Sequence, residues 1–124
     1  MRIFTIVGTL VAEVSALPTA PLPGGFVWVS CARSEFEAHQ AQLQAALQQL
    51  GGHPLVDLHV SDLLNPQLPS HYDYTSQYDM LVFRRLSTGH ADTTPSPTAK
   101  RSGPPILRRI NTDPVGFAVF DAVL

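Results

Sequence analysis

The side chains best suited to chemistry in this 124-residue chain gather in one short stretch, which contains His53, Asp57, His59 and Asp62. Imidazole and carboxylate groups at short spacing are ligands with which proteins bind transition metals. A metal ion held in this way could activate a water molecule for hydrolysis. A stand-alone small metal-dependent hydrolase that uses these four residues is therefore one reading of the sequence.

The secondary structure predicted for this stretch decides whether the four side chains can converge. Pro54 suits the first position of a helix, because its missing amide donor is not needed there. Asn65 and Pro66 end that helix. On a helix over 54–65, with about 100° of rotation per residue, the four side chains point in different directions. The pattern thus favours a capping His53 and solvated polar side chains over a closed metal site, and it predicts no catalytic residue.

Asp62 could bind a divalent cation without the other three residues. The apolar positions of the same helix predict its buried side, formed by Val56, Val60, Leu63 and Leu64. Asp62 faces away from that side, so we expect its carboxylate to be exposed. An exposed carboxylate suits hard divalent cations, which prefer oxygen ligands.

The N-terminal half of the chain predicts the scaffold that positions these residues. A hairpin is expected from Ile3–Val7 and Leu10–Val14 around Gly8-Thr9, and Phe26–Cys31 reads as a third strand. A capping box at Ser34 and Glu37 opens the clearest helix. One apolar stripe of this helix should pack on a sheet, and its members are Phe36, Leu43, Leu47 and Leu50. Gly51-Gly52 ends the helix, because glycine takes the left-handed conformation at low cost.

The C-terminal half predicts further strands. Asp79–Leu86 is a strand, 87–105 is a Pro-, Ser- and Thr-rich loop, and the last strands are Ile106–Asn111 and Val115–Leu124 with a turn at 112–114. The alternation of strands and helices predicts an α/β fold, with a mixed sheet and helices packed on it. Because the last apolar run has no polar cap, we expect a fragment of a longer protein.

Composition narrows the class of protein. A hydrophobic content of 44%, a charged content of 15% and a length of 124 residues indicate a single globular domain over 1–124. A formal net charge of −2 gives no electrostatic footprint for nucleic acid. The lone Cys31 fits a reducing compartment. The sequence contains no apolar run long enough to span a bilayer.

The sequence predicts two further groups of polar or charged side chains at the surface. A polar-aromatic patch is predicted from His71, Tyr72, Asp73, Tyr74 and Tyr78, and a role in packing or at an interface is expected for it. A basic stripe across paired strands is predicted from Arg84, Arg85, Arg108 and Arg109, as a solvated sheet edge or as a surface for an acidic partner.

The order of these elements resembles the N-terminal cytoplasmic domain of the CorA family of divalent-cation transporters. The segments that carry the resemblance are FVWVS, the capped helix, GGHPLVDLHVSDLLN, YDMLVFRRL and the tail TDPVGFAVFDAVL. Members of that family show a Trp-centred strand, a helix, a His-Pro-Leu turn into a second helix that ends Asp-hydrophobic-Leu-Asn, and a Tyr-led apolar strand. Together these segments cover about four-fifths of the chain.

The resemblance implies an α/β/α sandwich in the cytoplasmic funnel of a homopentameric Mg²⁺ or Co²⁺ transporter of the inner membrane. Its membrane spans would follow this chain, so the chain alone would not transport ions. In that family an acidic residue at the position of Asp62 binds a regulatory divalent ion between subunits. The chain departs from the pattern at Ser61, where members often carry Glu. We therefore expect binding of Mg²⁺, Co²⁺ or Zn²⁺ by the isolated chain to be weak or absent. A third reading is an α/β ligand-binding module without a metal.

Overall fold

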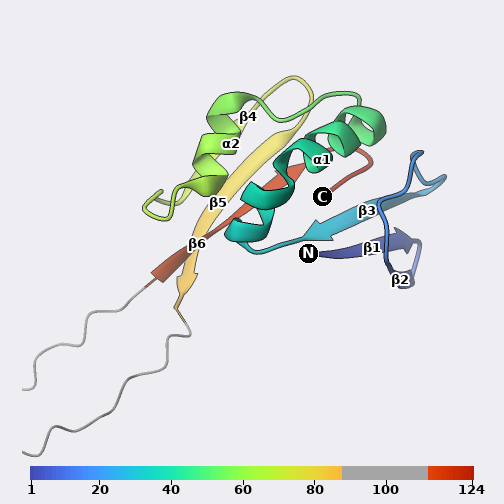
Figure 1. Ribbon diagram of the computed structural model, residues 1–124, viewed down its shortest axis with the longest axis horizontal. Helices are drawn as coiled ribbons and strands as arrows, with labels where there is room; N and C mark the ends of the chain where they lie inside the picture. The colour runs from blue at the N-terminus through green and yellow to red at the C-terminus, as the bar shows by residue number, and fades with distance from the viewer. Residues whose placement is uncertain (88–111) are drawn as a thin grey trace, which may run out of the picture.

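The computed structural model describes residues 1–87 and 112–124, and the following statements concern these residues (Figure 1). They contain both helices and strands, so the predicted α/β content is confirmed. In chain order the elements are β1 (Arg2–Val7), β2 (Leu10–Val14), β3 (Gly25–Ser30), α1 (Arg33–Gly51), α2 (Asp57–Leu64), β4 (His71–Tyr74), β5 (Asp79–Leu86) and β6 (Thr112–Val119).

The first three strands form an antiparallel sheet in the order β2-β1-β3, here called sheet A. The predicted hairpin is confirmed: β1 and β2 are joined at Gly8-Thr9, and Gly8 has a φ of 57°. A positive φ costs glycine little because it has no Cβ. The predicted strand over 26–31 is present as β3, shifted by one residue.

The other three strands form a second antiparallel sheet in the order β4-β5-β6, here called sheet B. The bounds of β5 are those predicted from the sequence. β4 lies in the segment of the predicted polar-aromatic patch, where no strand was predicted. The turn expected at 112–114 is wrong, because these residues open β6 and pair with β5 at Leu86, Arg85 and Arg84. The strand expected over 106–111 lies outside the described residues.

A short parallel contact joins the two sheets. After β6 the chain turns, with the Phe120 amide donating to the carbonyl of Val123, and Val123 then pairs with Val27 of β3. The amides of Val27 and Val29 donate to the carbonyls of Ala122 and Leu124. The sequence predicted one mixed sheet, whereas the described strands form two antiparallel sheets linked by this parallel bridge.

α1 begins two residues earlier than the predicted capping box. Its N-cap is Ala32, whose amide donates to Oε2 of Glu35 at 2.8 Å, so the Ser34–Glu37 box is wrong. The helix runs through Gly51 and is closed by Gly52, which has a φ of 82°, as the two glycines predicted. Of its predicted apolar stripe, three residues are buried and one is partly buried, in the order Phe36, Leu43, Leu50 and Leu47.

α2 begins at Asp57, three residues later than Pro54 predicted. Other parts of the chain bind the backbone of the intervening residues in an extended conformation. The side-chain amide of Gln44 both accepts from the Leu55 amide, at 2.7 Å, and donates to the Leu55 carbonyl, at 2.9 Å. The amide of Val56 donates to the hydroxyl of Tyr78 at 3.0 Å. The bond to the Leu55 carbonyl occupies an acceptor that a helix from Pro54 would use, and Val56 is extended with a ψ of 151°, so the helix starts after Val56.

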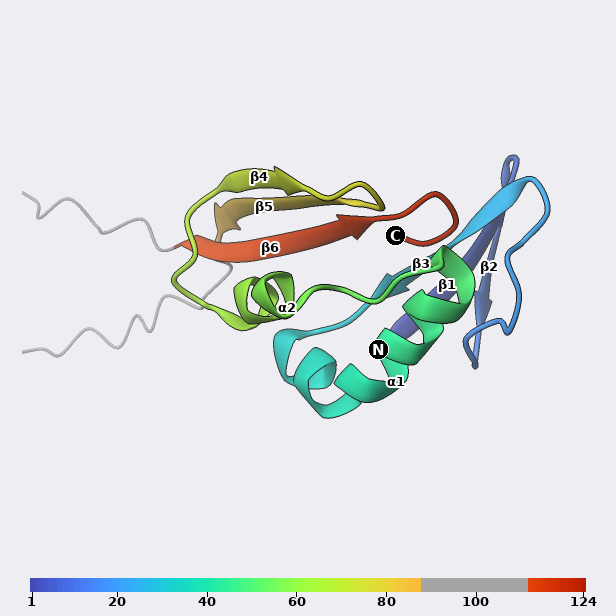
Figure 2. The ribbon, with the colours of Figure 1, turned by 90° about the horizontal axis from the view of Figure 1, so that it is seen from above.

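Figure 2 shows both helices on the same side of sheet B. α2 packs closely on β6, because Gly116 leaves room for the side chain of Leu63, which a Cβ at that position would strike. The buried core lies between the helices and the two sheets, and it includes Val27, Leu43, Leu55, Val60 and Phe120. The opposite face of sheet B carries exposed apolar and aromatic side chains, which include Tyr72, Tyr74, Leu81 and Phe83.

The helix-to-sheet packing predicts a graded response to truncation. Leu43→Ala should lower the free energy of unfolding by about 2–5 kcal/mol, the usual cost of removing a buried leucine side chain. Leu47→Ala should cost less because Leu47 is only partly buried. Leu58→Ala, at a site that is 63% exposed, serves as the control and should change stability by no more than about 0.5 kcal/mol. Urea denaturation measures all three, and equal losses at 43 and 58 would show that the buried face of α1 is misassigned.

Candidate functional site

The structure separates the four residues that could have formed a hydrolytic metal site. His53 and Asp57 are exposed, and His53 does not cap α2, whose N-cap is Val56. His59 is 2% exposed and lies inside the fold. Among the described residues, no group of three or more His, Cys, Asp or Glu side chains is arranged to hold a metal ion. These four residues therefore do not form one metal site in the described part of the chain.

His59 instead forms the centre of a buried hydrogen-bond network between α2 and sheet B. Its Nδ1 lies 2.8 Å from the hydroxyl of Tyr78, and its Nε2 lies 3.1 Å from Oδ2 of Asp73. The Tyr78 oxygen accepts from the Val56 amide, so its own hydrogen can be donated to Nδ1. Nε2 then carries the ring proton and donates it to Asp73, which can only accept as a carboxylate. Each polar atom of His59 and Tyr78 thus has a hydrogen-bond partner in this network.

The network alters the titration of its two partners. The hydrogen bond from His59, together with the one from the Tyr74 amide, holds the pKa of Asp73 below its ordinary value. Burial raises the pKa of Tyr78, whose ring also stacks on Phe120 with centroids 4.5 Å apart. Both shifts keep Asp73 ionised and Tyr78 protonated at neutral pH, which are the states that the network requires.

Asp62 lies near the end of α2, and its environment differs from the prediction. Its side chain is 19% exposed, so the expected open carboxylate is wrong. The cause is β4, which lies across α2 and brings Nε2 of His71 to 3.8 Å from Oδ2 of Asp62. The carboxylate remains at the surface of the fold but faces an imidazole.

The predicted polar-aromatic patch is divided by the alternation of β4. His71 and Asp73 point towards α2, where they meet Asp62 and His59. Tyr72 and Tyr74 point to the opposite face and stack on each other with centroids 6.1 Å apart. Tyr78 is buried. The patch is thus two surfaces, one polar and facing α2, one aromatic and open.

The predicted basic stripe is divided where the structure describes it, because Arg85 is exposed whereas Arg84 is bound to neighbouring segments. Arg84 donates through Nη1 to the carbonyl of Leu68 at 2.9 Å and through Nε to the hydroxyl of Thr112 at 2.7 Å. It therefore anchors the segment before β4 and the start of β6. Arg108 and Arg109 lie outside the described residues.

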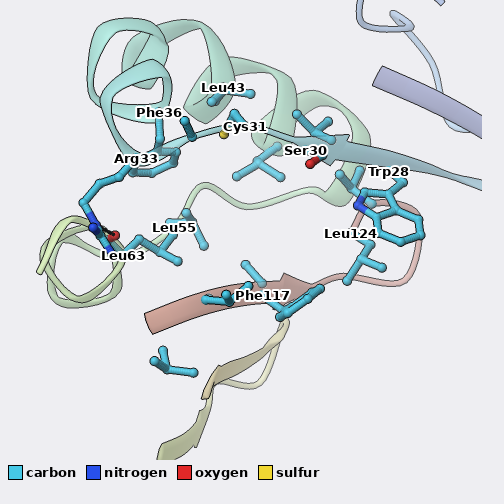
Figure 3. A pocket seen from close by; sticks show the side chains of 18 of the residues that line it. Trp28, Ser30, Cys31, Arg33, Phe36, Leu43, Leu55, Leu63, Phe117 and Leu124 are labelled. Atoms are coloured by element: carbon cyan, nitrogen blue, oxygen red, sulfur yellow. Dashed lines mark hydrogen bonds between the residues drawn. The ribbon is translucent and has the colours of Figure 1, made fainter. Parts of the chain in front are cut away.

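An open groove with a volume of about 570 Å³ lies between β3 and β6 (Figure 3). Its lining is mainly apolar and comes from both helices and both sheets, with Phe36, Leu55, Leu63 and Phe117 among its members. Two charged residues of the helices, Arg33 and Asp62, belong to its lining, and Nε of Arg33 donates to the Leu63 carbonyl at 3.1 Å. The positive charge of Arg33 also interacts favourably with the negative, C-terminal end of the α2 dipole.

Comparison with known proteins adds no assignment, because no family model, no curated protein and no solved structure matches the chain. Neither helix in the described part of the chain is long and apolar enough to cross a membrane.

The buried network predicts the effect of deleting one hydroxyl. Tyr78→Phe should lower the free energy of unfolding by about 1–3 kcal/mol, because the Val56 amide and Nδ1 of His59 both lose a buried partner. Tyr74→Phe is the matched control, since Tyr74 is 69% exposed. Denaturation of both variants measures the difference, and equal stability of the two would contradict the network.

The lowered pKa of Asp73 predicts a dependence of stability on acid. A carboxyl group whose pKa is lower in the folded state stabilises the fold fully above its ordinary pKa, which is about 3.9. That contribution is lost as the pH falls through the folded value. Asp73→Asn should therefore remove part of the fall in stability below about pH 4. Asp57→Asn, at an exposed site, is the control, and an unchanged acid profile in Asp73→Asn would contradict the assignment.

Proposed function

We propose that the chain is a regulatory domain of a CorA-like divalent-cation transporter for Mg²⁺ or Co²⁺. The observation that carries the proposal is the placement of Asp62. The Asp-Leu-Leu-Asn segment closes α2, and the Asp62 carboxylate lies at the surface of the fold beside β4. This is a position from which a carboxylate can share an ion with a neighbouring subunit.

The arrangement of the elements supports the same proposal. A hairpin, the Trp28 strand, two helices and a strand that begins at Asp79 follow in the order on which the resemblance rests. The helices cover one face of sheet B, and the other face carries stacked aromatic side chains such as Phe83 and Phe117, whose centroids are 5.4 Å apart. Exposed apolar surface of this kind is typical of a face that another layer covers. A second helical layer there would complete an α/β/α sandwich.

The groove between the sheets fits this arrangement as well. The segment from Ala122 to Leu124 begins a parallel ladder on β3 at the end of this groove. A further strand in the groove would join sheets A and B into the single mixed sheet of the proposed sandwich. The apolar lining of the groove suits such a buried strand.

The proposed mechanism is ionic linkage between subunits of a homopentamer. A divalent ion bound between Asp62 and a neighbouring subunit would neutralise carboxylates that otherwise repel each other. Because the ion would bind the closed assembly more tightly than the open one, ion binding would favour closure. In this proposal the chain lies on the cytoplasmic side of the inner membrane, and the ion is a regulator that the chain itself does not transport.

The proposal predicts weak binding of Mg²⁺ by the isolated chain. Calorimetry should give a dissociation constant in the millimolar range, as expected for a site with few carboxylates. Asp62→Asn should abolish even this binding, whereas Asp57→Asn, at an exposed site on the same helix, should leave it unchanged. Tight Mg²⁺ binding that survives Asp62→Asn would overturn the assignment of Asp62.

The parent reading frame gives an independent test. Two hydrophobic spans downstream of a long helix would support a transporter, and their absence would contradict it. In the full protein, Asp62→Asn should leave assembly intact and raise the Mg²⁺ concentration needed for closure. Closure at an unchanged concentration would show that the carboxylate has no part in gating.

A further inference from the structure

His71 and Asp62 face each other across the contact between β4 and α2. Nε2 of the imidazole lies 3.8 Å from Oδ2 of the carboxylate. This separation is too long for a hydrogen bond, which joins such atoms at about 2.7–3.2 Å. The two side chains therefore lie close without a direct bond.

The orientation of the His71 ring determines what can lie between them. Its Nδ1 is 3.2 Å from the carbonyl of Pro69, which can only accept a hydrogen bond, so Nδ1 carries a proton. In the neutral ring Nε2 then presents a lone pair to Asp62. A cation between two acceptors that face each other across this distance can interact with both.

The dimensions of the gap suit a metal ion. Zinc binds an imidazole nitrogen at about 2.0–2.1 Å and a carboxylate oxygen at about 2.0–2.2 Å, so one ion can touch both atoms across 3.8 Å at an open angle. A backbone carbonyl bonded to the other ring nitrogen is the usual partner of a metal-binding histidine, because it sets the tautomer. The side chains are 30% and 19% exposed, which leaves access for an ion and for water ligands.

We propose that His71 and Asp62 form a two-residue half-site for a borderline divalent ion such as Co²⁺ or Zn²⁺. The inference rests on the proposed function, because it adds a ligand to the regulatory position at Asp62. Imidazole nitrogen favours Co²⁺ and Zn²⁺ over Mg²⁺, which prefers oxygen. His71 therefore makes this position prefer Co²⁺ and Zn²⁺ to Mg²⁺. The ionised Asp73, on the same face of β4, adds negative charge nearby, and water or a second copy of the chain supplies the remaining ligands.

Titration of the chain with Co²⁺, Zn²⁺ and Mg²⁺, above the ordinary imidazole pKa of about 6.5, tests the half-site. The wild-type chain should bind Co²⁺ and Zn²⁺ more tightly than Mg²⁺. His71→Ala should weaken Co²⁺ and Zn²⁺ binding by about tenfold or more and leave Mg²⁺ binding unchanged. Asp62→Asn should weaken binding of all three. His53→Ala, which removes an exposed histidine from the same region, is the matched control.

A measurement on the unmutated chain protects the test against variants that fail to fold. Paramagnetic Co²⁺ should shift or broaden the NMR signals of the His71 ring at concentrations that leave those of His53 and His39 unaffected. Equal effects on all three rings, or Co²⁺ affinity unchanged in His71→Ala, would overturn the half-site. The second result would identify the contact as an ion pair between imidazolium and carboxylate.

The outcome is separable from that of the proposed function. Selective Co²⁺ binding through His71 in a chain whose parent frame lacks membrane spans would uphold the half-site and overturn the transporter. Loss of Mg²⁺ binding in Asp62→Asn, with Co²⁺ affinity unaffected by His71→Ala, would overturn the half-site and support the regulatory role of Asp62.

Discussion

The position of α2 depends on the hydrogen bonds of one buried imidazole. His59 contacts Tyr78 on one side and Asp73 on the other, and Tyr78 in turn binds the backbone at Val56, just before the helix. A buried polar side chain is tolerated only when its partners are all present. The orientation of α2 therefore depends on Asp73 of β4 and on Tyr78, which lies just before β5, and this couples α2 to sheet B.

The sequence predicted those elements whose pattern is local. The alternating pattern of β5 and the two glycines at the end of α1 are local signals that depend on no distant residue. Both the bounds of β5 and the end of α1 were predicted correctly. β4 was missed because its inward residues are His71 and Asp73, so it lacks an apolar alternation. Its polar inward face is explained only by the side chains of α2, which lie elsewhere in the chain.

The same distinction applies to the candidate site. Asp62 was predicted as a candidate metal ligand, but its neighbour His71 comes from another element and could not be paired with it from helical geometry. The start of α2 was predicted too early because the side chain of Gln44 in α1 binds the backbone of Leu55. A hydrogen bond between a side chain and a distant backbone group, such as that of Gln44 with Leu55, does not depend on any periodic pattern in the sequence.

These contacts restrict how an ion at Asp62 could act. α2 is held to sheet B by His59, to β6 by the close contact of Leu63 with Gly116, and to α1 by the Arg33 bond to the Leu63 carbonyl. Movement of Asp62 relative to the sheet would break hydrogen bonds of this network, and each buried polar group left without a partner costs about 1–3 kcal/mol. Binding of an ion would therefore shift the whole unit of α1, α2 and sheet B as a rigid body against its neighbour. That is the kind of motion by which a small ligand at an interface changes an assembly.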